Sequence, residues 1–128
     1  MIDKWNKVNT LIKQAVQEKY PTAITGTDAN NSQNPSQFPY VFVNQLGNIM
    51  RDNDLECGEN AVNSTFEIQV YSTESILQAR DIMSIVNDTL VPKGFTRIEV
   101  RQVENVLNPS IYRMVGRFRR VIANNDVI

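Results

Sequence analysis

Apolar residues recur at three- and four-residue steps near the start of the chain. The members of this stripe are Ile2, Trp5, Val8, Ile12, Ala15 and Val16. Such spacing places side chains along one side of a helix. We therefore predict an amphipathic helix over residues 2–19, with this stripe in the core. Tyr20 precedes Pro21, and a residue in that position is pushed out of the α region, so the helix should end there.

A period of two replaces this pattern further along the chain. Residues 64–71 alternate, with Phe66, Ile68 and Val70 on one side and Thr65, Glu67, Gln69 and Tyr71 on the other. This alternation predicts a strand with one buried face.

The residues before that strand divide into four parts. We predict a short strand over 22–27, a polar loop over 28–37 and a buried, β-rich strand over 40–43. Residues 44–63 show no clear periodicity. They form either one long loop or a protruding hairpin, and a connection of that length is often functional.

A second helix and two strands complete the pattern. Ser72-Thr73-Glu74 opens the helix, with a serine or threonine as N-cap and an acid in the first turn. Its apolar stripe is Ile76, Ala79, Ile82, Met83, Val86 and Leu90. Pro92 and Gly94 stop it. Strands are expected over 95–103 and 111–123, with Asn108-Pro109 in the turn between them.

The predicted order is α-β-β-β-α-β-β. Neighbouring strands joined by hairpins favour an antiparallel or mixed sheet with both helices packed on one face, an α+β fold. We find no internal repeat and no linker, so residues 1–128 are expected to form a single domain.

Composition narrows the function classes. The chain has 128 residues, with 13 basic and 14 acidic side chains and a net charge of −1. A protein that holds nucleic acid through phosphates usually has a basic excess, whereas near-neutrality permits self-association. No apolar run approaches the roughly 20 residues that span a bilayer, and the charged N-terminal residues do not form a signal peptide. We expect synthesis in a cytoplasm and no membrane partner.

Several kinds of chemistry lack their residues. The chain has no histidine and one cysteine, Cys57, which removes histidine-based catalysis and most zinc sites. Two glycine motifs that bind phosphate groups, G-x-x-x-x-G-K-[ST] and G-x-G-x-x-G, do not occur in the sequence. The run Asp52-Asn53-Asp54-Leu55-Glu56 resembles a calcium loop only superficially, because the closing glutamate is misplaced, and a solvated loop is the favoured interpretation. We expect no enzyme activity, no cofactor and no metal.

The last predicted strand carries four arginines. Arg113, Arg117 and Arg119 share one face by the period of two, and Arg120 faces the other way. Three interpretations stay open. The shared face could form cross-strand ion pairs, bind another subunit, or contact nucleic acid.

An ordered set of segments resembles a known family. The segments are Gln37–Val43, Glu59-Asn60-Ala61, Phe66–Ser72, Leu90–Arg97, Val103-Glu104-Asn105 and Ile111–Phe118. In this order and spacing, over nearly the whole chain, they resemble the tail terminator, or tail-to-head joining, proteins of long-tailed phages and prophages of Gram-positive bacteria.

The resemblance implies a structural virion protein without a cofactor, made in the bacterial host cytoplasm and located at the tail-head junction. Its subunits assemble into a ring, usually of six, that caps the tail tube, stops its elongation and meets the head-connector proteins. Genome DNA is only cargo passing through the lumen. The alternatives are another neck component such as a head-completion protein, a nucleic-acid-binding or other adaptor outside phages, or a small enzyme with an unrecognised site.

A ring requires each subunit to present two different surfaces to its neighbours. We hypothesise that an acidic segment of one copy meets the arginine face of the next. The residues of this hypothetical interface are Asp52, Asp54, Glu56 and Glu59 on one side, and Arg113, Arg117 and Arg119 on the other.

Overall fold

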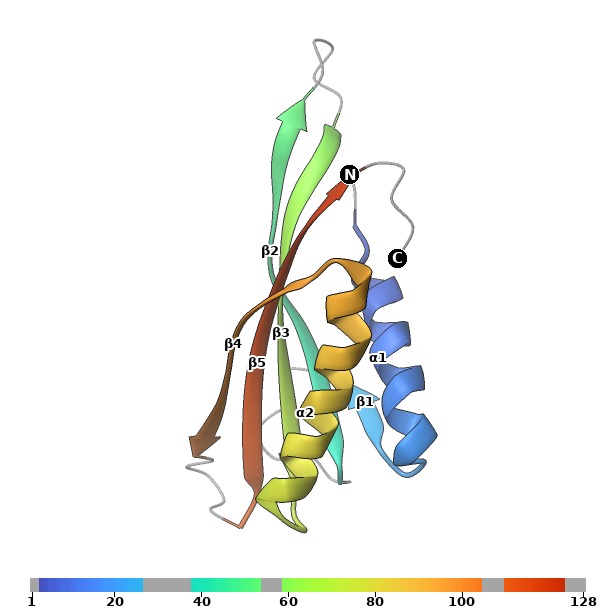
Figure 1. Cartoon of the computed structure of the whole chain (residues 1–128), viewed down its shortest axis with the longest axis vertical. Coiled ribbons are helices and arrows are strands. Elements are labelled where there is room, and N and C mark those ends of the chain that lie inside the picture. The colour runs from blue at the N-terminus through green and yellow to red at the C-terminus, as the bar shows by residue number, and fades with distance from the viewer. Residues whose placement is uncertain (1–2, 27–37, 54–58, 105–109, 124–128) are drawn as a thin grey trace.

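The chain folds into two helices beside one five-stranded sheet (Figure 1). The computed structural model describes residues 3–26, 38–53, 59–104 and 110–123, with the side chains of 26, 50–53 and 59–60 left aside. The elements are α1 (Trp5–Lys19), β1 (Ile24–Gly26), β2 (Tyr40–Asn53), β3 (Glu59–Ser72), α2 (Ile76–Leu90), the 3₁₀ turn η2 (Val91–Lys93), β4 (Thr96–Glu104) and β5 (Tyr112–Ala123). The predicted α+β class and element order are confirmed.

The sheet is mixed, with strand order β1-β2-β3-β5-β4. β1 runs parallel to β2, and every other neighbouring pair is antiparallel. The two longest strands, β2 and β3, form a hairpin that extends past both helices (Figure 1). The sequence leaves the range 44–63 open between a loop and a hairpin, and its described parts, 44–53 and 59–63, belong to the two strands of a protruding hairpin. The predicted loop over 28–37, the turn at Asn108-Pro109 and Cys57 all lie outside the described residues.

The main core lies between the helices and one face of the sheet, here called the inner face. Helix α1 contributes Val8, Ile12 and Val16, helix α2 contributes Ala79, Ile82, Met83, Val86 and Leu90, and the strands contribute Val41, Val43, Val62, Phe66, Ile68, Val70, Met114, Phe118 and Ile122. The predicted stripe of α2 is confirmed, with Ile76 partly buried, and that of α1 is confirmed for Val8, Ile12 and Val16. Ala15 is half-buried outside this cluster, and Ile2 lies outside the described residues. Trp5 is only partly buried, at the margin of this cluster.

A second apolar cluster lies on the opposite, outer face of the sheet. It joins Tyr40, Phe42, Tyr71 and Ile111. Tyr71 is fully buried and Gln69 nearly so, so the prediction that this strand buries only one face is wrong for its second half. The reason is tertiary: β2 brings aromatic rings opposite Gln69 and Tyr71 in the register, and these rings cover them.

Helix ends follow local chemistry, with two corrections. Helix α1 begins at Trp5 rather than at residue 2 and ends as predicted before Tyr20. Helix α2 is capped by Ser75, whose side chain accepts a hydrogen bond from the Gln78 backbone, not by Ser72 or Thr73, and its first turn holds no acid. Gly94, at φ 94°, ends the turn after α2 in the left-handed region, which glycine enters without a Cβ penalty.

Strand β4 is an edge strand. Among the described strands it pairs only with β5, and it is exposed along nearly its whole length. Helix α2 packs mainly on β3 and β5, and β4 lies beside this contact. No other described strand pairs with this edge of the sheet.

Candidate functional site

The arginines of β5 lie as the period of two predicts. Arg113, Arg117 and Arg119 project from the outer face, in register with Tyr71, Glu67 and Thr65 of β3. Arg120 faces the inner side, where its guanidinium lies against Gly94. The shared arginine face is confirmed, and β3 supplies its surroundings.

Two of the three outer arginines are bound within their own chain. Arg117 Nε lies 3.1 Å from Glu67 Oε2, a cross-strand ion pair. Arg113 donates to Gln69 Oε1 at 2.8 Å, and its guanidinium lies 5.7 Å from the centre of the Tyr71 ring. Buried Tyr71 also donates to Gln69 Oε1, at 2.6 Å, and Gln69 donates to Glu67 at 2.7 Å. This network ties the arginines to the sheet and favours the interpretation of cross-strand pairing.

Arg119 differs from the other two. It is exposed, and its side chain makes no hydrogen bond or ion pair to another described residue. Of the three outer arginines it is the one without a partner among the described residues, so it is the best placed of them to meet a carboxylate from another molecule.

Two residues of the acidic half of the hypothesised interface lie at the last paired positions of the β2–β3 hairpin. Asp52 and Glu59 belong to the last paired positions, opposite Ala61 and Asn53. Asp54 and Glu56 lie outside the described residues. The hairpin thus brings the ends of the acidic segment to one end of the molecule, and its pairing with the arginines of a neighbour stays a prediction.

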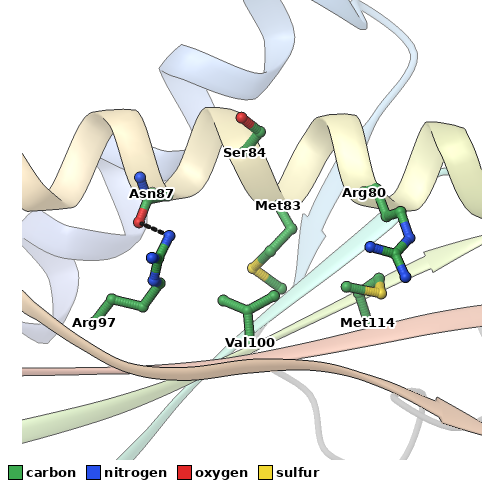
Figure 2. Close-up of a pocket in the computed structure, with 7 residues that line it drawn as sticks. All are labelled: Arg80, Met83, Ser84, Asn87, Arg97, Val100 and Met114. Atoms are coloured by element: carbon green, nitrogen blue, oxygen red, sulfur yellow. Dashed lines mark hydrogen bonds between the residues drawn. The ribbon is translucent and has the colours of Figure 1, made fainter.

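A groove between α2 and β4 was not predicted from the sequence (Figure 2). Its volume is about 180 Å³, and it is lined by Arg80, Met83, Ser84, Asn87, Arg97, Val100 and Met114. Met83 belongs to the predicted helical stripe, but the groove forms only because β4 passes beside α2 without packing under it. The signal that could have pointed to it is the pair of arginines flanking the apolar positions of two different elements.

A polar cluster joins the two helices. The Tyr20 hydroxyl donates to Asp81 Oδ2 at 2.5 Å, and Lys19 Nζ lies 2.8 Å from the same oxygen. Hydrogen bonds from Lys19 and Tyr20 lower the pKa of the Asp81 carboxyl below its ordinary 3.8. The hydrogen bond to Asp81 raises the pKa of Lys19 and that of Tyr20. These groups lie on the surface, so the cluster acts as a link between helices.

The described residues offer little for metal or membrane chemistry. Within those ranges, no three histidine, cysteine, aspartate or glutamate side chains gather where they could hold a metal ion. None of the helices in the described part of the chain is long and apolar enough to cross a bilayer.

No family model matches the chain, and no curated protein matches it in sequence. The surface features that the geometry defines are the arginine row of β5, the β4 edge and the groove between α2 and β4.

Proposed function

We propose that this chain is a structural subunit of a phage tail, a tail terminator that forms a ring on the end of the tail tube. The ring would stop elongation of the tube and join the tail to the head connector, with genome DNA passing through its lumen. The ordered sequence segments described above motivate the proposal. They suggest six subunits and location in the virion.

The open β4 edge is the observation that supports it most directly. A long exposed edge strand is a ready template for pairing with another chain, and β4 presents Ile98 with 49% of its surface exposed. The hairpin of β2 and β3, with exposed Leu46 and Ile49, supplies an unlike surface. Two unlike surfaces are what a closed head-to-tail ring needs.

The test is the mass of the purified protein in solution, measured by light scattering over a range of concentrations, with and without purified tail-tube protein. We expect a species of about six chains, alone or on mixing. A monomer that ignores the tube protein at every concentration would contradict the proposal.

A matched pair of variants locates the contact. Ile98→Lys puts a charge on the open edge and should reduce assembly. Val121→Lys makes the same change on the outer face of β5, away from the groove and from β4, where Val121 is 41% exposed, and should leave assembly unchanged. If both variants assemble equally well, the ring proposal stands but β4 is not part of the interface.

A further inference from the structure

The groove between α2 and β4 has an apolar floor and a polar rim. Met83 and Met114 form the floor and are almost completely buried, while Val100 at the side is 37% exposed. Figure 2 shows the side chains of α2 and β4 facing each other across this space. Methionine side chains adapt readily to the shape of an entering group.

The rim carries two positive charges that form no ion pair with another described residue. Arg97 donates to the neutral Asn87 Oδ1 at 3.3 Å. Arg80 makes no hydrogen bond or ion pair to another described residue, and the lining contains no acidic side chain. Arg113 and Arg117 on the outer face, by contrast, already have partners on β3. The groove is therefore better prepared than the outer face to receive carboxylates next to an apolar group.

The chain itself contains a segment of that chemistry. Residues 52–59 hold four carboxylates, one leucine and no lysine or arginine. The strands that lead to this segment, β2 and β3, run past the helices and away from them (Figure 1). An acidic segment at the end of a protruding hairpin can reach a neighbouring molecule.

We propose that the acidic end of the β2–β3 hairpin of one subunit binds in the groove between α2 and β4 of the next. Arg80 and Arg97 receive its carboxylates, and the methionine floor receives its apolar side chain. The contact is head-to-tail, so it can repeat around a ring. This inference rests on the proposed ring and replaces the outer-face arginines by the groove arginines as the partners of the acidic segment. The complementary charges set register and partner choice.

The single cysteine provides a direct test, because Cys57 lies within the acidic segment. The probe is a second cysteine, Ser84→Cys in the groove wall, in a chain that also carries Cys57→Ser. This chain is mixed with the wild-type protein, with and without tail-tube protein, and oxidised mildly, so that any disulfide between position 84 and Cys57 joins two different chains. The matched control is Val121→Cys with Cys57→Ser, which places the thiol on the outer face near Arg119. We expect a disulfide between position 84 and Cys57, identified by mass spectrometry of the linked peptides and so distinguished from a Cys57–Cys57 dimer of wild-type chains, and no such disulfide from position 121.

Charge reversal gives an independent readout. Arg80→Glu combined with Arg97→Glu should weaken self-association about tenfold or more at low salt, because two attractive contacts become repulsive. Arg119→Glu should change it less. Both groove arginines are exposed, and circular dichroism checks that each variant folds. Changing Asp54 and Glu56 to lysine in the reversed chain should restore association.

The outcomes separate this inference from the proposed function. A ring that crosslinks from position 121 and not from position 84 overturns the groove and supports the outer face. A ring that assembles equally well with Arg80→Glu and Arg97→Glu also overturns the groove contact. A protein that stays monomeric with tube protein present, and gives no crosslink, overturns the ring and the groove contact together.

Discussion

Gly116 lies on the inner face of β5, directly against Met83 of α2. A Cβ added at this position would lie 2.8 Å from Met83 Sδ and 3.2 Å from Phe118 Cε2. Both distances are shorter than the roughly 3.5–4.0 Å at which carbon atoms attract each other best. The close packing of α2 on β5 thus depends on a residue without a side chain.

We predict that Gly116→Ala destabilises the protein by about 1 kcal/mol. Overpacking a core costs roughly 1–3 kcal/mol, and replacing glycine in a strand interior by alanine recovers roughly 0.5–1 kcal/mol. The flexible end of Met83 can shift, which keeps the net cost at the lower end. In a Met83→Ala background the main clash is gone, and the same change should stabilise by about 0.5 kcal/mol.

The assay is urea unfolding followed by far-ultraviolet circular dichroism, at a concentration where the protein is monomeric. The four chains form a double-mutant cycle, for which we expect a coupling energy of about 1–2 kcal/mol. Gly47→Ala is the matched control, because a Cβ there meets nothing within 4 Å. Equal effects of Gly116→Ala in both backgrounds would refute the argument that Met83 creates the constraint.

Two further predictions concern the helices. Ser75→Ala removes the N-cap of α2 and should cost about 1 kcal/mol of stability, measured by the same unfolding assay, whereas Ser84→Ala on the exposed side of the helix should cost almost nothing. Asp81→Asn should weaken the link between α1 and α2. Because the pKa of Asp81 is lower in the folded state, its contribution is present above the unfolded value and disappears as the pH falls through the folded value. The difference in stability between wild type and Asp81→Asn should therefore be largest above about pH 4 and should disappear at lower pH.

For each of these two predictions, one outcome of the measurement would contradict it. Equal losses for Ser75→Ala and Ser84→Ala would show that the cap contributes nothing specific. A difference for Asp81→Asn that stays constant down to pH 2 would show that the Asp81 charge is not what links the helices.

The arginine row could be predicted from the local pattern of the sequence, but its partners and the groove could not. The period of two correctly placed Arg113, Arg117 and Arg119 on one face, because a strand alternates its side chains whatever its neighbours are. The same reasoning could not tell that Arg117 meets Glu67, since the two residues are far apart in sequence. The groove was missed for the same reason: its walls come from α2 and β4, and no local spacing reports that they pass side by side.

The sequence by itself determined the number, type and order of the α-helices and strands, as well as most of the buried stripe of each helix. Helical and strand periods are local properties, so a stripe such as Val8, Ile12 and Val16 is visible without the fold. Only the tertiary structure decided that β5 lies between β3 and β4, that β1 is parallel to β2, and that Tyr71 is buried on the second face of its strand. Strand pairing joins segments across long stretches of chain, and whether a side chain is covered depends on which segment arrives opposite it.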